Sequence, residues 1–100
     1  MKISEIINLL NEHKHVTILT PNFYEKKLLY DRFKLKVFNA SLIDKDIIKI
    51  NNSYITFITP DNFNSIKFES LFIIEFADQI PHHILNNVLS DDVMLVREIV

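Results

Sequence analysis

The chain has 100 residues, of which 48% are hydrophobic and 24% charged, and its net charge is −2. This balance is typical of one globular domain, which we expect to span residues 1–100, and it excludes an intrinsically disordered chain. Residues 1–14 do not have the pattern of a signal peptide, and no apolar run reaches roughly 20 residues, so we expect no membrane insertion. The lack of cysteine is compatible with a cytoplasmic protein.

The first part of the chain predicts a helix followed by a strand. The helix is expected over residues 3–13, where four apolar residues recur with helical spacing: Ile3, Ile6, Ile7 and Leu10. Residues 16–20 are mostly apolar or β-branched, and they predict a core strand that ends at Pro21.

A second helix is expected to begin after Asn22, a typical N-cap residue, with Glu25 in the capping-box position. Its buried stripe is predicted to contain Tyr24, Leu28, Leu29 and Phe33. Its outward side chains are predicted to include Lys26, Lys27 and Arg32.

The middle of the chain predicts short strands. Residues 36–38 are compatible with one of them. Residues 46–60 alternate between apolar and polar side chains on both sides of Asn51-Asn52-Ser53, and this pattern predicts a β-hairpin. A connector that includes one helical turn is expected over residues 63–70.

Residues 71–76 contain a run of apolar side chains that leads to Glu75, as in a buried parallel strand that presents a carboxylate at the C-terminal edge of a sheet. Pro81 suits the first turn of a third helix, whose apolar stripe would comprise Ile80, Ile84, Leu85, Val88 and Leu89. A last strand is expected over residues 93–100. The predicted fold is therefore α/β, with a small, mainly parallel sheet that is flanked by helices and carries a β-hairpin insertion.

The segment LFIIEFADQIP at residues 71–81 resembles the Walker B segment of P-loop NTPases of the helicase and large-terminase type. Two further segments, VTILTPN at 16–22 and ITFITPD at 55–61, are similar to segments that precede Walker B in the same families. The resemblance implies the topology of such an NTPase cut immediately after its phosphate-binding loop. In this class the P-loop strand lies beside the strand that corresponds to residues 93–100, so this last strand is expected at a sheet edge.

The chain departs from these families at the catalytic positions. Glu75 stands where the resemblance implies a metal-binding aspartate, and Phe76 stands where it implies a catalytic glutamate. A phosphate-binding loop needs glycine, which the chain lacks altogether. We therefore expect no enzymatic activity and no cofactor, unless a partner completes the site with its own phosphate-binding loop.

The predicted function is accordingly a non-catalytic protein-binding module. The residue usage, rich in Ile, Asn, Lys and Phe, is typical of an AT-rich genome and agrees with a phage or mobile element. Such a module would modulate DNA metabolism or host defence.

Two metal sites can be considered. Glu75 and Asp78 together could hold Mg²⁺; alternatively, Asp78 caps the following helix, and Glu75 pairs with a lysine or sits at the sheet edge. The four histidines could bind zinc, although surface histidines are the more common case: His13, His15, His82 and His83.

The charge is unevenly distributed along the chain. Residues 1–60 have nine Lys and Arg against six Asp and Glu, whereas residues 61–100 have two against seven. This asymmetry suits either an ordinary solvated surface or a nucleic-acid-binding face, on which Tyr24 and Tyr30 could stack on bases. The alternative function is therefore a small nucleic-acid-binding protein that uses Lys26, Lys27, Arg32, Lys34, Lys36 and Lys49.

The predicted strand at residues 93–100 carries apolar side chains on both faces, which is typical of an interior strand. Exposed apolar edges aggregate unless something covers them. The cover could be the hairpin around residues 48–59 or the same strand of a second copy, and we expect a homodimer. Its interface would contain Val93, Leu95, Val96 and Ile99.

Overall fold

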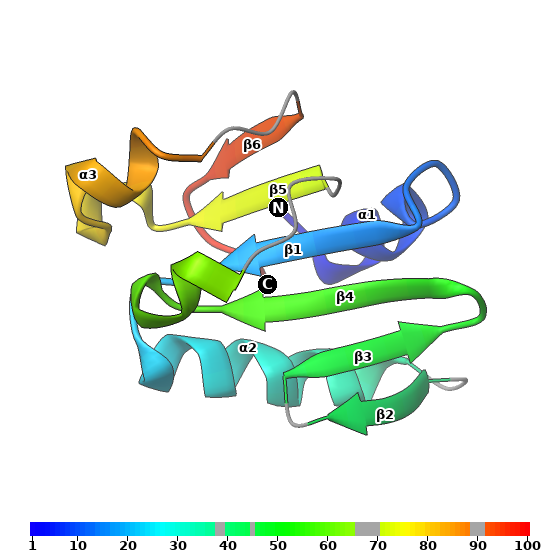
Figure 1. The fold of residues 1–100 in the computed structure, drawn as a ribbon. Coiled ribbons are helices and arrows are strands. Elements are labelled where there is room, and N and C mark those ends of the chain that lie inside the picture. Colours follow the sequence, from blue (N-terminus) through cyan, green and yellow to red (C-terminus); the bar gives the residue numbers. More distant parts are fainter. Residues whose placement is uncertain (38–39, 45, 66–70, 89–91) are drawn as a thin grey trace.

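The computed structural model describes residues 1–37, 40–44, 46–65, 71–88 and 92–100 (Figure 1). The elements follow in the order α1 (Ile3–Leu9), β1 (His15–Leu19), α2 (Phe23–Lys36), β2 (Ala40–Asp44), β3 (Ile47–Ile50), β4 (Ser53–Ile58), η1 (Pro60–Ser65), β5 (Leu71–Glu75), η2 (Ala77–Gln79), α3 (His82–Leu85) and β6 (Val93–Val96), where η marks a 3₁₀ helix.

The described strands form a six-stranded sheet in the order β2-β3-β4-β1-β5-β6 (Figure 1). β1 pairs in parallel with β4 on one side and with β5 on the other, and β5 pairs in parallel with β6. β2, β3 and β4 are joined by antiparallel pairings. The predicted α/β fold, with its mainly parallel sheet, flanking helices and β-hairpin, is confirmed.

Successive side chains of the central strands supply two hydrophobic cores, one on each face of the sheet. Val16 and Ile18 of β1 pack on the first face, in a core that contains buried residues of α1 and α2. Leu19 and Ile74 pack on the opposite face with Ile80 and with apolar side chains of η2 and α3. We call these two surfaces the α1–α2 face and the α3 face.

Two local features follow from the sequence as predicted. The side chain of Asn22 caps α2, because its Oδ1 accepts a hydrogen bond from the backbone N–H of Glu25 over 2.9 Å. The hairpin joins Ile50 to Ser53 through a turn in which Asn51 adopts a positive φ of 55°, a conformation that asparagine tolerates well.

The orientation of α2 differs from the predicted one. Its buried side chains are Lys26, Leu29, Tyr30 and Phe33, whereas Tyr24 is 71% exposed. The prediction of a buried Tyr24 and an outward Lys26 is wrong because the rings of Tyr30 and Phe33 pack edge to face on Phe57 of β4, with centroid distances of 5.4 and 5.3 Å. This packing sets the rotation of the helix, and Lys26 lies on the same side, four and seven residues earlier.

The segment after α2 also differs from the prediction. A short strand was expected at residues 36–38, but the helix continues through Lys36, so this prediction is wrong for Lys36. Residue 38 lies outside the described part of the chain. The strand that follows α2 is instead β2, which begins at Ala40 and pairs with β3.

The last strand is shorter than predicted, because β6 ends at Val96 and the chain turns into the core. Ile99 is fully buried on the α1–α2 face. The N–H of Ile3 donates to the carbonyl of Val100 over 2.8 Å, and the N–H of Val100 donates to the carbonyl of Met1 over 2.9 Å. Residues 1–3 and 98–100 therefore lie side by side.

Two helices are likewise shorter than predicted. α1 ends at Leu9, and residues 10–12 form turns. α3 comprises only His82–Leu85, and Leu89, which was expected on its apolar stripe, lies outside the described residues.

Candidate functional site

Glu75 ends β5 as predicted, and it is buried, with 2% of its surface exposed. Its Oε2 accepts a hydrogen bond from the backbone N–H of Ile99 over 2.7 Å. The guanidinium of Arg32 on α2 donates to the carbonyl of the same residue over 3.4 Å. The side chains of Glu75 and Arg32 thus hold both backbone polar groups of one buried residue. We call this arrangement the Glu75–Ile99–Arg32 clamp.

The clamp does not fit the metal site that was predicted at Glu75. Burial raises the pKa of the Glu75 carboxyl, because the charged form loses its hydration, and the nearby Glu25 and Glu98 add to this rise. The Ile99 hydrogen bond and the Arg32 charge oppose it. A shift in this direction makes the ionised form, which metal binding requires, less favourable than in an exposed glutamate.

Asp78, the predicted second ligand, is exposed on η2. The neighbouring Ala77 and Ile80 pack on the α3 face, whereas Glu75 is held by Ile99 on the α1–α2 face. Asp78 is not the cap of α3 either, because Pro81 occupies that position. Within the described part of the chain, no three His, Asp or Glu side chains are grouped so that they could hold a metal ion.

Phe76, at the position where the resemblance implies a catalytic glutamate, has a left-handed backbone with φ 53°. This conformation costs a bulky residue about 1–2 kcal/mol relative to the right-handed region. The neighbouring strand helps to hold it, because the N–H of Phe76 donates to the carbonyl of Val96 over 3.2 Å.

The histidines fall at opposite ends of the sheet. His15 begins β1, and its Nε2 lies 2.7 Å from the hydroxyl of Thr56. His82 and His83 begin α3, which follows the C-terminal end of β5. Because β1 and β5 are parallel, the two groups of histidines are separated by the length of the strands and cannot share a zinc ion.

The six predicted nucleic-acid-binding residues do not share one surface. Lys26 is 6% exposed, and Arg32 belongs to the clamp. Lys49 on β3 pairs with Tyr54, and its ammonium lies 5.7 Å from the centroid of that ring. The remaining three candidates are exposed on α2: Lys27, Lys34 and Lys36.

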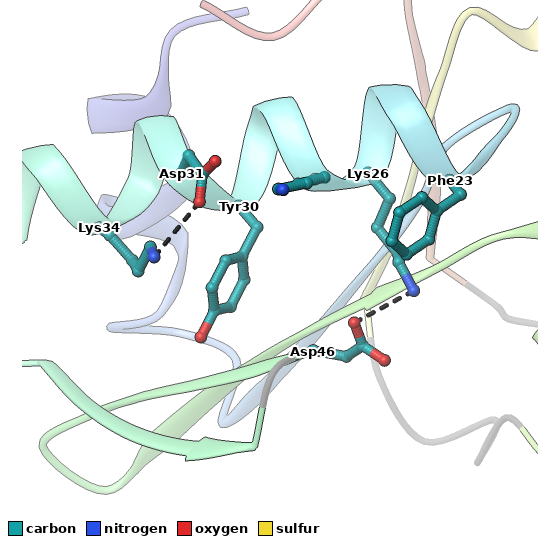
Figure 2. Close-up of a pocket in the computed structure, with 7 residues that line it drawn as sticks. Phe23, Lys26, Tyr30, Asp31, Lys34 and Asp46 are labelled. Atoms are coloured by element: carbon teal, nitrogen blue, oxygen red, sulfur yellow. Dashed lines mark ion pairs between the residues drawn. The ribbon is translucent and has the colours of Figure 1, made fainter.

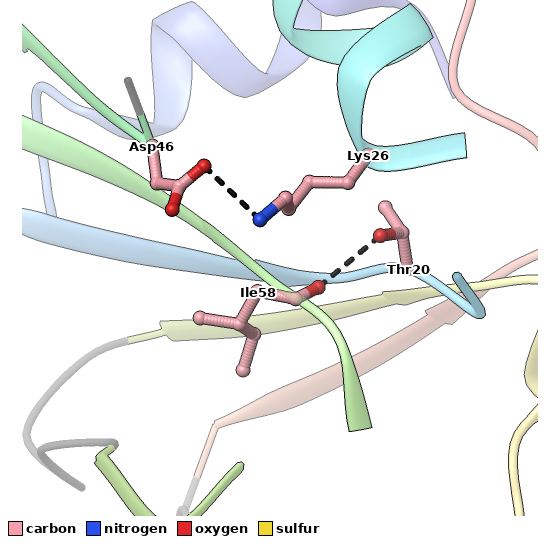
Figure 3. A network of polar contacts seen from close by, with 4 residues as sticks. All are labelled: Thr20, Lys26, Asp46 and Ile58. Carbon is pink, nitrogen blue, oxygen red and sulfur yellow. Dashed lines mark hydrogen bonds and ion pairs between the residues drawn. The ribbon is translucent and has the colours of Figure 1, made fainter. Parts of the chain in front are cut away.

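Lys26 forms a largely buried ion pair with Asp46, with 3.1 Å between Nζ and Oδ1 and side-chain exposures of 7% and 27% (Figure 3). The backbone around the pair is fixed by hydrogen bonds. The N–H of Phe57 donates to the carbonyl of Asp46 over 2.9 Å, and the hydroxyl of Thr20 donates to the carbonyl of Ile58 over 3.1 Å. The ion pair thus joins α2 to the start of the hairpin.

A cavity of about 250 Å³ opens beside this ion pair (Figure 2). It lies between α2 and the residue that precedes β3, and its other lining residues are Phe23, Lys27, Tyr30, Asp31 and Lys34. This cavity was not predicted from the sequence. The available signal was the spacing of Phe23 and Tyr30, two turns apart on one helix, with lysines between and beside them.

β6 forms one edge of the described sheet, and the hairpin lies toward the other edge, so the hairpin does not cover it. Val93, Met94 and Leu95 are 40%, 36% and 67% exposed. Val96 is partly buried against the α1–α2 core, and Ile99 lies inside that core. Of the four predicted interface residues, the structure therefore brings Val93 and Leu95 to the exposed edge and places Ile99 away from it.

Among the described helices, none is both long and apolar enough to cross a bilayer. Comparison of the chain with protein-family models, with curated proteins and with solved structures finds no significant match to any of them.

Proposed function

We propose that this protein is a non-catalytic protein-binding module whose binding element is β6, and that its partner at this strand is a second copy of the same chain. The exposed apolar edge of the sheet carries the proposal. Leu95 is 67% exposed although its pairing partner, Ile74 of β5, is buried. An apolar edge strand that stays uncovered is a site of aggregation, so a specific partner is the expected solution.

The backbone of β6 has the polar groups that strand pairing requires. The carbonyls of Asp92 and Val96 accept hydrogen bonds from the N–H groups of Phe72 and Phe76 of the β5 segment. Because backbone polar groups alternate in direction along a strand, Met94 also faces β5, whereas Val93 and Leu95 turn their N–H and C=O groups away from it. No described strand pairs with this outer side.

Two copies can satisfy these groups by antiparallel pairing around a two-fold axis at Met94. Val93 of each copy then lies opposite Leu95 of the other, and every such pair exchanges both N–H···O=C bonds. A register centred on Leu95 would instead place Val93 opposite Arg97, which lies beyond the end of β6.

The wider proposal keeps the origin suggested by the sequence, a degenerate P-loop NTPase of the helicase or terminase type from a phage or mobile element. The position of β6 at the sheet edge supports it, because the P-loop strand would lie there in this class. The burial of Glu75 in the clamp supports a non-catalytic role, since its carboxyl group accepts the hydrogen bond of the Ile99 N–H. A cytoplasmic role in DNA metabolism or host defence belongs to the same proposal.

Sedimentation at micromolar concentrations tests the binding element. We expect a dimer that Leu95→Lys converts into a folded monomer, because a buried lysine at the paired edge costs more than the pairing gains. Leu35→Lys is the matched control, since Leu35 is 84% exposed on α2 and should leave the dimer intact. A wild-type monomer, or a dimer insensitive to Leu95→Lys, would remove β6 as the binding element. Mg²⁺-dependent nucleotide turnover that is abolished by Glu75→Gln would overturn the non-catalytic part of the proposal.

The alternative, nucleic-acid binding, is favoured by one observation: Tyr24 and Lys27 are both exposed on α2, with Lys34 and Lys36 on the same helix. A salt titration of binding to single- and double-stranded DNA tests it. A steep loss of affinity with salt that disappears in a Lys27→Glu, Lys36→Glu variant would support this function. Binding that does not respond to these charges would exclude it.

A further inference from the structure

We propose that the cavity between α2 and the start of the hairpin binds a small aromatic anion, a ligand with a planar ring and one carboxylate or phosphate group. This site is separate from β6 and does not depend on the proposed dimer. The cavity has a volume of about 250 Å³, comparable to eight water molecules at roughly 30 Å³ each. It therefore suits a one- or two-ring compound rather than a larger cofactor.

The preference for a planar ring follows from the walls of the cavity. Phe23 and Tyr30 line it from positions two helical turns apart, and Phe23 is 65% exposed (Figure 2). A large apolar ring that remains exposed beside a cavity offers a stacking surface, and aromatic pairs gain stability beyond the area that they bury.

The preference for an anion follows from the charges. Three lysines and two aspartates line the cavity, and two of the lysines are engaged in ion pairs. Lys26 pairs with Asp46, and Lys34 pairs with Asp31 over 3.2 Å. Three lysines against two aspartates give these lining residues a net charge of +1, and among the ion pairs of the described residues none includes Lys27. A carboxylate or phosphate compensates this charge, whereas a cationic ligand would add to it.

The cavity is also held in shape before any ligand binds. The Lys26–Asp46 pair connects its two sides, and the backbone of Asp46 is hydrogen-bonded to Phe57 of β4. The Nζ of Lys26 lies 5.4 Å from the centroid of the Phe23 ring, which further restrains that exposed side chain. A site on such fixed elements loses little conformational entropy on binding.

The test is a titration of ¹⁵N-labelled protein followed by amide chemical shifts, with 2-naphthoate as the anionic probe. Its neutral and cationic counterparts are 2-naphthylmethanol and 2-naphthylmethylammonium. We expect naphthoate to bind with a dissociation constant of about 1 mM, as a fragment of this size typically does, and to shift amides around Phe23, Lys27 and Asp46. The alcohol should bind at least about threefold more weakly, and the cation should not bind.

Two pairs of variants separate the cavity from the general surface of α2. Phe23→Ala should weaken naphthoate binding about tenfold, whereas Tyr24→Ala, which removes an equally exposed ring outside the cavity, should not. Lys27→Gln should weaken it several-fold and Lys36→Gln should not. Equal binding of naphthoate and the cation, shifts away from the cavity, or equal effects of Phe23→Ala and Tyr24→Ala would each overturn the proposal. The amide spectra themselves report whether every variant is folded.

Discussion

The Glu75–Ile99–Arg32 clamp makes a prediction about stability and pH, tested by comparing wild type with Glu75→Gln and Glu75→Leu. Glutamine keeps an oxygen that can accept the Ile99 N–H but cannot ionise. Leucine has a similar size and removes the acceptor, so the buried N–H of Ile99 loses its partner. Relative to glutamine, leucine should therefore lower the free energy of unfolding by about 1–3 kcal/mol, the usual cost of an unsatisfied buried polar group.

The pH dependence follows from the raised pKa of Glu75. In the unfolded chain this carboxyl titrates near its ordinary value of 4.5, and in the folded protein it titrates at a higher pH. The folded state therefore holds the proton more tightly. The resulting stabilisation is complete below pH 4.5 and is lost as the pH rises through the folded pKa, by at most about 1.4 kcal/mol per pH unit. Glu75→Gln lacks this loss, so the free energy of unfolding of the variant should equal that of wild type at pH 4 and exceed it at pH 8.

Urea unfolding followed by circular dichroism between pH 4 and pH 8, at one protein concentration, measures these differences. The comparison with the variants separates the contribution of Glu75 from that of the rest of the chain. A difference between Glu75→Gln and wild type that stays constant from pH 4 to pH 8 would refute the argument from burial. Equal stability of the leucine and glutamine variants would refute the argument from the Ile99 hydrogen bond.

Two further predictions concern single contacts. Asp46→Ala should destabilise the fold by roughly 3–5 kcal/mol, because it leaves the Lys26 ammonium buried without its partner. Asp31→Ala removes an ion pair near the surface and should cost at most about 1 kcal/mol. Urea unfolding measures both free energies, and similar costs for the two variants would contradict the buried ion pair. Asn22→Ala should lower the free energy of unfolding by about 1 kcal/mol, because α2 loses its cap. Asn22→Asp keeps the acceptor oxygen and should retain most of this stability. An unchanged unfolding midpoint for Asn22→Ala would contradict the capping contact.

The features that the sequence predicted well depend on neighbouring residues. The core strand at β5 is a short apolar run, the α2 cap needs only Asn22 and Glu25, and the hairpin needs two alternating segments around an asparagine turn. Each of these signals lies within about fifteen residues of chain. Local propensity and tertiary packing agree at these places, so the prediction from sequence holds.

The features that the sequence missed depend on distant residues. Lys26 is buried because Asp46, twenty positions later, compensates its charge, and a periodicity argument places every lysine outside. The final strand was predicted to continue to residue 100, but Ile99 is drawn into the core by Glu75 and Arg32, neither of which is near it in sequence. The cavity beside Phe23 has the same origin, since its two sides come from α2 and the hairpin.

Cysteine cross-linking tests the proposed pairing of β6 most directly, because the natural chain contains no cysteine. In the register centred on Met94, the two copies of this residue form a non-hydrogen-bonded pair with Cα atoms about 4.5 Å apart, within the range of roughly 4.4–6.8 Å that a disulfide spans. Under mild oxidation Met94→Cys should form a covalent dimer rapidly, and Leu35→Cys on α2 should not. Cross-linking of the two variants at the same rate, or its absence from Met94→Cys, would contradict the proposal that β6 binds a second copy of the chain.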